Sequence, residues 1–366
     1  MRIAIVDASL IPNEQVSQDA LLQQRVLQAS GFTCFLYCDS ASAAQGGRSC
    51  AALFENNPHA FDLMIVHLDW AAGQLLACLS ACHTPVLLRF HGLADGSLFR
   101  PWNSVYADTC DLASDALSDW MEASRVSGWH WLVDTPYMSR QLIAAGLHAE
   151  QIETLAPLHH CSALLTLRPD PIWSQRLTSQ EHYCLVPGPL VPGEGLQFLL
   201  QAFRVYYQDL DPTAKLLLGA AVPRGLDEWA TQVQHWIKEF GLEDRILHLH
   251  SADLASRKSA YAGSRIVLLA PEHNYYRGSI LEAQALGVPV LLRSDTTMNA
   301  IAAAGALRMK ADCDPYAYAA AMHELIQNSD LRTELFTAGL SNYANRFSPE
   351  ILEREFLGRV HACLKR

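Results

Sequence analysis

The first lysine of this 366-residue sequence is Lys215. Residues 1–170 hold 8 arginines against 17 acidic residues, a net charge of −9, whereas the remainder has a net charge of −2. Nucleic acids and anionic lipids are bound through clustered basic side chains. The acidic first part therefore predicts no nucleic-acid partner and no docking of that part on an anionic membrane.

The ten cysteines form no Cys-x-x-Cys pair. The pair Cys78 and Cys82 lies on one face of an expected helix, whereas a structural zinc site needs four closely spaced ligands. The stretch His159-His160-Cys161 carries metal-ligating groups, but the sequence suggests no fourth ligand. Unpatterned cysteines are typical of buried small side chains in a reducing compartment. We expect no metal site.

Long apolar runs are also missing, because no window reaches the 18 residues of a membrane span. The start of the chain, Met1 to Asp7, becomes acidic too quickly for a signal peptide. Neither a P-loop nor a G-x-S-x-G elbow is present. With 50% hydrophobic and 18% charged residues, long disorder is excluded. We expect a soluble, cytoplasmic protein of about two domains.

Short apolar runs alternate with amphipathic helical patterns, which predicts βαβ units and an α/β fold with parallel sheets. The first series of expected strands is Ile3–Asp7, Phe32–Tyr37, Leu63–His67, Val86–Phe90 and Trp129–Val133. The second series is Tyr183–Val186, Lys215–Gly219, Ile246–His250, Ile266–Ala270 and Val288–Leu292. Arg168-Pro169-Asp170-Pro171 separates the two series, and an amphipathic helix over Pro349–Leu364 ends the chain.

Ligands of such sheets bind beyond the carboxyl ends of strands, often at helix N-termini. The stretch from Pro271 to Val290 runs from a strand end through a polar loop into a helix that begins near Gly278 and Ser279. Backbone N–H groups at that place attract phosphate. Glu282 is expected in the first turn of this helix, where it either binds a ligand or complements the helix dipole.

Three further strand ends are candidates. The loop from Val186 to Gly195 is rich in glycine and proline, so its backbone can approach a ligand, although such loops are also plain connectors. His91 follows a strand, where it is either functional or structural. The loop Asp7–Asn13 carries no glycine. The pairs Asp209/Asp211 and Asp312/Asp314 resemble D-x-D motifs, but we interpret them as turn and cap residues.

The stretch around Glu282, followed by Gly287-Val288-Pro289-Val290, resembles the donor-site motif of retaining GT-B glycosyltransferases. This large group includes many bacterial mannosyl- and glucosyltransferases, and the resemblance covers nearly the whole chain. The loop from Val186 to Gly195 lies where the group has its G-R-L-x-x-x-K-G loop, and Trp131–Ser139 looks like the stretch that closes the N-terminal domain.

The resemblance implies a GT-B architecture of two Rossmann-like domains that face a cleft. Residues 1–170 would form the acceptor-side domain and residues 171–346 the donor domain. Residues 347–366 would form a helix that crosses back to the first domain. A nucleotide-diphosphate sugar would be the co-substrate, with no cofactor and no metal, and the acceptor would be a saccharide or a glycolipid.

The resemblance also implies site residues. The second glutamate of the family's E-x7-E motif binds the nucleotide ribose, and Glu282 matches it. The first glutamate contacts the transferred sugar, and Asn274 stands in its place. His91 matches a family histidine that lies near the donor sugar. Gly188, in the glycine-rich loop, is expected on the donor as well.

The family's arginine and lysine that neutralise the pyrophosphate align with Pro189 and Glu194, so both cations are missing. The departing diphosphate needs a positive group. Arg277 is the first candidate, unless it is a solvated surface residue, and Arg224 is the second.

The amides of Gly278 and Ser279 would add hydrogen bonds to the phosphates. The resemblance thus implies a retaining hexosyltransferase of polysaccharide biosynthesis. The alternative is a donor-inactive GT-B scaffold that serves a glycosylation complex. A third reading, a sugar epimerase or a phosphorylase, would need motifs that the sequence does not show.

Overall fold

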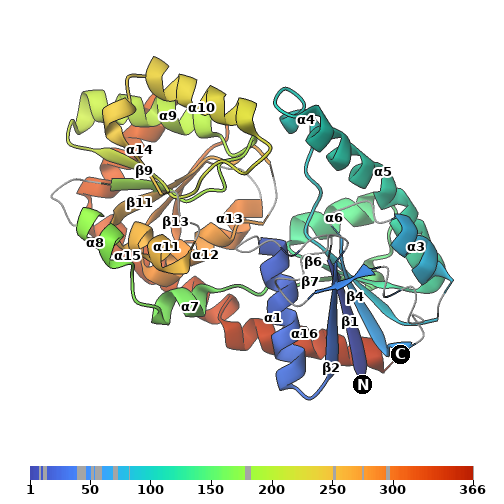
Figure 1. Cartoon of the computed structure of the whole chain (residues 1–366). Coiled ribbons are helices and arrows are strands. Elements are labelled where there is room, and N and C mark those ends of the chain that lie inside the picture. The colour runs from blue at the N-terminus through green and yellow to red at the C-terminus, as the bar shows by residue number, and fades with distance from the viewer. Residues whose placement is uncertain are drawn as a thin grey trace. The chain divides into compact units, whose positions relative to one another are not determined.

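The computed structural model divides the chain into two compact units (Figure 1). Unit 1 comprises Met1–Arg100, Ser104–His159 and Pro349–Arg366, and unit 2 comprises Pro101–Asn103 and His160–Ser348. The residues that the structure describes are 1–7, 10, 15–38, 47–50, 53, 60–68, 73–81, 83–177, 183–249, 253–273, 276–293 and 297–365. No helix in these ranges is both long enough and apolar enough to cross a membrane.

Unit 1 is built on a seven-stranded parallel sheet with the order β3-β2-β1-β4-β5-β6-β7. Its strands are β1 (Arg2–Asp7), β2 (Thr33–Cys38), β3 (Arg48–Ser49), β4 (Leu63–Leu68), β5 (Val86–Phe90), β6 (His130–Val133) and β7 (Ile152–Thr154). Its helices are α1 (Gln15–Ala29), α3 (Gly73–Ser80), α4 (Gly96–Phe99), α5 (Ser104–Ser127), α6 (Pro136–Ala144) and α16 (Pro349–Leu364). A 3₁₀ turn, Ala149–Gln151, leads into β7.

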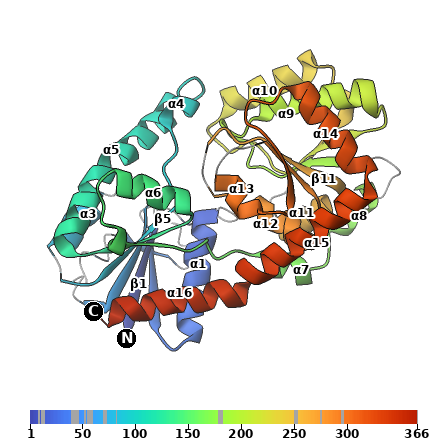
Figure 2. The same cartoon turned by 180° about the vertical axis from the view of Figure 1, so that it is seen from behind.

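Helices cover both faces of this sheet, as Figures 1 and 2 show for α1 and α16 on one side and α3 and α5 on the other. The central strands β4 and β5 are buried along their whole length. This explains why they read as continuous apolar runs in the sequence. The last helix, α16, packs within unit 1 against α1 and β5.

Unit 2 is built on a six-stranded parallel sheet with the order β10-β9-β8-β11-β12-β13. Its strands are β8 (Tyr183–Val186), β9 (Lys215–Leu218), β10 (Ile246–His248), β11 (Ser264–Leu269), β12 (Val290–Arg293) and β13 (Ala306–Met309). Its helices are α7 (Cys161–Thr166), α8 (Pro171–Leu177), α9 (Leu196–Val205), α10 (Asp227–Glu239), α11 (Leu254–Ala262), α12 (Gly278–Leu286), α13 (Thr297–Ala302), α14 (Pro315–Gln327) and α15 (Ser329–Arg346). A π-helical turn, Tyr206–Leu210, continues α9, and a 3₁₀ turn, Glu243–Arg245, leads into β10.

The expected fold class is confirmed, since both units are Rossmann-like parallel sheets wrapped by helices. All ten expected strands exist. The strands expected over Val86–Phe90 and Tyr183–Val186 have the expected bounds, and the other eight have ends shifted by one or two residues; the strand expected over Val288–Leu292 is β12, Val290–Arg293. The sequence patterns missed β3, β7 and β13, which have two to four residues and lie at or next to sheet edges. Such short edge strands leave no apolar run to detect.

The strand order of unit 2 reverses between β8 and β11, which are hydrogen-bonded neighbours. The loops that follow these two strands therefore leave the sheet side by side at its carboxyl edge. This topological switch point is where doubly wound sheets bind their ligands. In unit 1 the corresponding loops follow β1 and β4, and their residues 8, 9, 11–14 and 69–72 lie outside the described part of the chain.

Glycine allows the loop after β8 to press onto the neighbouring strand end. Gly195 has a φ of +67°, and a Cβ atom there would lie 2.0 Å from the carbonyl oxygen of Ala270. Gly241 has nearly the same φ, +66°, but open space around it. The two positions therefore separate the cost of the backbone conformation from the cost of the close approach.

We predict that Gly195→Ala lowers the free energy of unfolding by roughly 2–5 kcal/mol, because the new methyl group adds overpacking to a left-handed backbone. Gly241→Ala should lower the free energy of unfolding by only about 1–2 kcal/mol, the cost of the left-handed backbone conformation. Urea unfolding followed by tryptophan fluorescence measures both. Equal losses in the two variants would show that the contact with Ala270 contributes nothing.

Candidate functional site

The loops after β8 and β11 are joined at the switch point of unit 2. The backbone N–H of Glu272 donates to the carbonyl oxygen of Gly193 at 2.8 Å. The carboxylate of Glu194 forms an ion pair with Nη2 of Arg277, and its Oε1 lies 3.0 Å from Nε2 of His273. One carboxylate from the first loop thus meets two basic side chains from the second loop.

Arg277 is a buried cation and not a solvated surface residue, so that alternative is wrong. Its side chain is 14% exposed. Burial lowers its pKa to about 10, which still leaves it charged at neutral pH. Arg277 is the N-cap residue of α12, and its side chain makes no capping hydrogen bond to the first turn. The cation and the positive end of the helix dipole therefore lie together.

Ser279, the second residue of α12, is 4% exposed. Its Oγ and the Nε of Arg277 are buried and have no hydrogen-bond partner among the described residues. Buried polar groups are nearly always paired, so an unpaired pair of donors beside a helix N-terminus indicates a place for a ligand. A phosphate group has the acceptor oxygens that these two donors lack.

Glu282 differs from its expected placement. It is the fifth residue of α12, not a first-turn residue, and it is buried, so dipole complementation does not explain it. Its Oε1 lies 2.8 Å from Nη2 of Arg257, and its Oε2 accepts a hydrogen bond of 2.8 Å from the hydroxyl of Tyr261. Both partners come from one face of α11, four residues apart.

The contacts of Glu282 fix the direction of its carboxylate. Burial and the nearby carboxylate raise the pKa of Tyr261 well above its usual value, so its hydroxyl stays a donor. The same hydroxyl lies 3.4 Å from the carbonyl oxygen of Ser279. A carboxylate accepts up to about four hydrogen bonds, so Glu282 retains capacity for a further donor such as a sugar hydroxyl.

Of the other expected donor-side residues, Gly188 and Arg224 form no hydrogen bond or ion pair with this cluster in the described part of the chain. Gly188 has a φ of +84°, and a Cβ there would lie 2.6 Å from the Cβ of Ala220, so its bare backbone serves the packing of two loops. Arg224 is exposed after β9 and forms no hydrogen bond or ion pair among the described residues. Asn274 lies outside the described residues.

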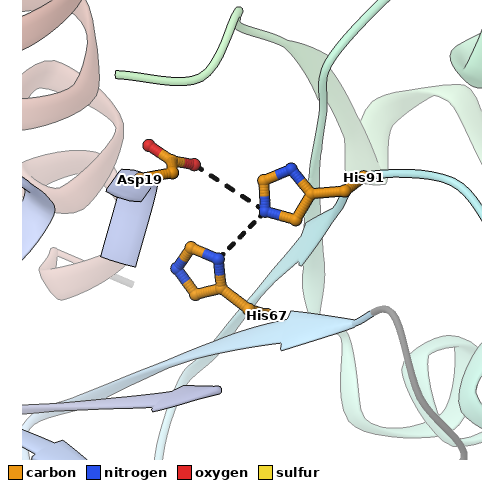
Figure 3. Close-up of side chains that lie close together, drawn as sticks. All are labelled: Asp19, His67 and His91. Atoms are coloured by element: carbon orange, nitrogen blue, oxygen red, sulfur yellow. Dashed lines mark hydrogen bonds and ion pairs between the residues drawn. The ribbon is translucent and has the colours of Figure 1, made fainter. Parts of the chain in front are cut away.

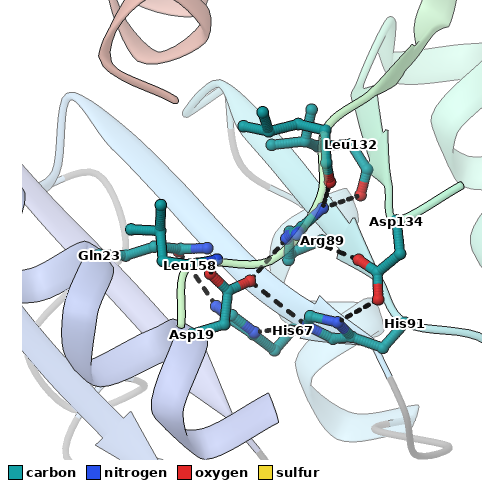
Figure 4. Close-up of polar contacts among 9 residues, drawn as sticks. Asp19, Gln23, His67, Arg89, His91, Leu132, Asp134 and Leu158 are labelled. Atoms are coloured by element: carbon teal, nitrogen blue, oxygen red, sulfur yellow. Dashed lines mark hydrogen bonds and ion pairs between the residues drawn. The ribbon is translucent and has the colours of Figure 1, made fainter. Parts of the chain in front are cut away.

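His91 belongs to a buried network in unit 1 (Figures 3 and 4). Its Nδ1 lies 3.0 Å from Oδ2 of Asp134, and its Nε2 lies 2.9 Å from Nδ1 of His67. The far nitrogen of His67, Nε2, lies 3.1 Å from Oε1 of Gln23. Both ring nitrogens of His91 are therefore engaged within the protein.

Arg89 links the two carboxylates of this network. Its Nε lies 2.7 Å from Oδ2 of Asp19 and its Nη2 lies 3.0 Å from Oδ1 of Asp134. Its Nη1 donates to the carbonyl oxygens of Leu132 and Leu155. At 1% exposed, this guanidinium is among the largest fully buried side chains of the protein.

The tautomers of His67 and His91 follow from the partners of their outer ring nitrogens, Gln23 and Asp134. Gln23 Oε1 and the carboxylate of Asp134 only accept, so Nε2 of His67 and Nδ1 of His91 carry hydrogens. The two facing nitrogens would then present lone pairs to each other at 2.9 Å unless one proton lies between them. With that proton on His91, the charges of Asp19, Asp134, Arg89 and His91 sum to zero.

The directions in which the pKa values of His91 and His67 shift agree with a proton on His91. Burial opposes the charge on His91, but the charge and hydrogen bond of Asp134 outweigh it, so the pKa of His91 is raised. Burial and the charge of His91 lower the pKa of His67 well below its usual value. Ligand atoms of Asp19, His67 and His91 lie within 4.8 Å of one another, a metal-compatible grouping. The charge of this group of residues is already balanced by the proton on His91.

The lesser expectations have clear outcomes. Asp211 accepts hydrogen bonds from the backbone and hydroxyl of Thr213, and Asp314 caps α14, so both D-x-D pairs supply turn and cap residues as expected. Of the nine cysteines that the structure describes, seven are buried and none is in a disulfide.

The sequence patterns missed Asp19, His67, Arg89 and Asp134. Arg89 carried a usable signal, because a charged residue inside the apolar strand β5 must find a buried partner. They also missed Arg257 and Tyr261, whose i, i+4 spacing on α11 places them on one helix face.

We predict that the pair His67 and His91 gives the protein a stability maximum near pH 6.5. His91, with a raised pKa, contributes stability that is complete below about 6.5 and is lost as the pH rises through its folded value. His67, with a lowered pKa, loses stability as the pH falls below about 6.5. Urea unfolding across pH 5–9 measures this profile.

The control is Asp134→Asn, which removes the charge that holds the proton on His91. In this variant the decline above pH 6.5 should disappear, and NMR titration of the histidine rings should place the pKa of His91 below its value in the unsubstituted protein. Replacing exposed His235 by Gln should change neither measurement. A pKa of His91 at or below 6.5 in the unsubstituted protein would contradict the proton assignment.

Known proteins resemble this chain in two ways: in the fold of the whole chain and in the sequence of its second unit. No match was found among the curated proteins. A glycosyltransferase from Rickettsia africae has 14% identity and a TM-score of 0.77 over 100% of this chain and 99% of its own. Anabaena HepE, solved with UDP and glucose, has 14% identity and a TM-score of 0.75 over 99% of this chain and 100% of its own.

Sucrose-phosphate synthase from Thermosynechococcus elongatus has 16% identity and a TM-score of 0.76 over 99% of this chain and 98% of its own. These likenesses establish the fold. Residues 169–340, which include Glu194, Arg277 and Glu282, match the family model for glycosyl transferases group 1. The chain therefore has the GT-B fold, and residues 169–340 of its second unit are similar to the glycosyl transferases group 1 family.

Proposed function

We propose that this protein is a retaining, metal-independent glycosyltransferase that moves a hexose from a nucleotide-diphosphate sugar to a saccharide or glycolipid acceptor. The observation that carries the proposal is the group of unpaired donors at the start of α12, where Arg277 and Ser279 lie beside the switch point of a group 1 domain. HepE, of the same fold, was solved with UDP-glucose. The cytoplasm, where nucleotide sugars are made, is the proposed location.

Each part of the donor has a proposed partner. Arg277, the amides of Gly278 and Ser279 and the Ser279 hydroxyl would hold the diphosphate. Glu282, oriented by its ion pair with Arg257, would accept hydrogen bonds from the ribose hydroxyls. Arg224 and the backbone of Gly188 stay predictions as further donor contacts.

The chemistry needs no protein nucleophile. The bond between the sugar C1 and the diphosphate oxygen breaks, and the acceptor hydroxyl oxygen attacks C1 from the same face. The acceptor proton passes to the departing phosphate oxygen. Arg277 and the N-terminus of α12 would stabilise the negative charge that develops on that oxygen.

The sugar contacts proposed for Asn274 and His91 rest on the resemblance to the family. Since both nitrogens of His91 are engaged, a sugar hydroxyl would have to replace His67 or Asp134 as its partner. The charge balance of the network favours release of neutral His67, because Asp134 holds the charged ring.

We predict that Arg277→Ala and Glu282→Ala each weaken donor binding about 10–100-fold, since a hydrogen bond to a charged group is worth roughly 1.5–3 kcal/mol. Isothermal titration calorimetry against UDP, GDP and their sugars measures this. Arg354→Gln removes an exposed arginine of α16 and should leave the affinity unchanged. Unchanged affinity in both site variants would remove these residues from the donor site.

A donor-inactive scaffold that serves a glycosylation complex is the second candidate. The observation that favours it is the pairing of Glu194 with Arg277, because the buried cation already has an anion. The same calorimetry decides between the two candidates. Absence of binding to every nucleotide diphosphate and sugar tested would favour the scaffold.

A further inference from the structure

At the start of α12, a carboxylate of the protein already pairs with the cation of Arg277. Glu194 pairs with Nη2 of Arg277 and lies 3.0 Å from His273. The three side chains are 12%, 14% and 8% exposed, so solvent screens these contacts little. The attraction between the two charges is therefore screened less than in a surface pair.

The backbone holds Glu194 in this place. Its two neighbours, Gly193 and Gly195, have φ values of +86° and +67°, a conformation that favours glycine. Gly193 accepts the hydrogen bond from Glu272, and Gly195 packs onto Ala270. The turn is thus anchored on both sides of the carboxylate, and its position is a property of the loop.

The charges around Glu194 are balanced without any ligand. Burial lowers the pKa of His273 to about 4, so this ring is neutral at neutral pH. Glu194 and Arg277 then cancel, and Glu272 points its side chain to solvent. The helix dipole and the unpaired donors of Arg277 and Ser279 remain to attract an anion.

We propose that Glu194 is a resident anion that holds the place of the donor's diphosphate on Arg277 and sets how tightly a nucleoside diphosphate binds. This inference rests on the proposed function. A buried arginine without an anion is strongly destabilising. Glu194 compensates Arg277 in the free protein, and the diphosphate takes over that compensation when it binds.

Removing the charge of Glu194 should change the affinity for the nucleoside diphosphate, and the direction of that change can be measured. If Glu194 competes with the diphosphate, removing its charge leaves Arg277 uncompensated in the free protein and makes the ligand more favourable. If Glu194 only orients the guanidinium, removing its charge weakens binding. The two roles move the affinity in opposite directions, so one substitution separates them.

The test is Glu194→Gln, with calorimetry against UDP and GDP at fixed ionic strength and thermal unfolding with and without each nucleotide. We expect binding about tenfold tighter or more, the scale of a hydrogen bond to a charged group. We also expect a lower unfolding temperature in the free variant that the nucleotide restores. The matched control is Glu334→Gln, an exposed glutamate of α15, which should change neither measurement.

Equal or weaker binding by Glu194→Gln, with binding by the unsubstituted protein, overturns the inference and leaves the proposed function in place. Binding by the variant alone supports the inference. Binding by neither protein contradicts the proposed function and the inference together. If Glu194→Gln does not fold, Glu194→Asp keeps the charge but shortens the side chain, and it should bind UDP and GDP more tightly than the unsubstituted protein by a smaller factor.

Discussion

Three arginines that lie largely inside the protein, at the carboxyl edges of these sheets, each pair with a carboxylate. Arg89 lies between Asp19 and Asp134, Arg257 holds Glu282, and Arg277 holds Glu194. Removing one partner of a buried ion pair typically costs about 3–5 kcal/mol, because the other charge is left without compensation. In each case the partners come from different loops or helices. The need to compensate buried charge therefore fixes the loops, and through them the geometry of both candidate sites.

The fold could be predicted from the sequence because its signals are local. Continuous apolar runs such as β4 and β5 are long enough to recognise, and parallel strands joined by helices allow few arrangements. The same reasoning placed the polar loops after β8 and β11 at a ligand-binding edge. It failed for β3 and β7, since strands of two and three residues at the edge of a sheet carry no periodic pattern.

The pairings inside the sites could not be predicted, because they join residues far apart in the chain. Glu194 and His273 are 79 residues apart, and Arg89 and Asp19 are 70 apart. The sequence shows Glu194 where a cation was expected, but it does not show that Arg277 lies against it. The i, i+4 spacing of Arg257 and Tyr261 can be read from the sequence, whereas their pairing with Glu282 cannot.

The location of Glu194 and Arg277 on two separate loops constrains how such a site can change during evolution. A cation on the first loop and an anion on the second would satisfy the same charge balance as the arrangement seen here. Replacing only one of the two residues gives a protein with two like charges in contact or with one charge that has no partner. The two positions are therefore expected to vary together.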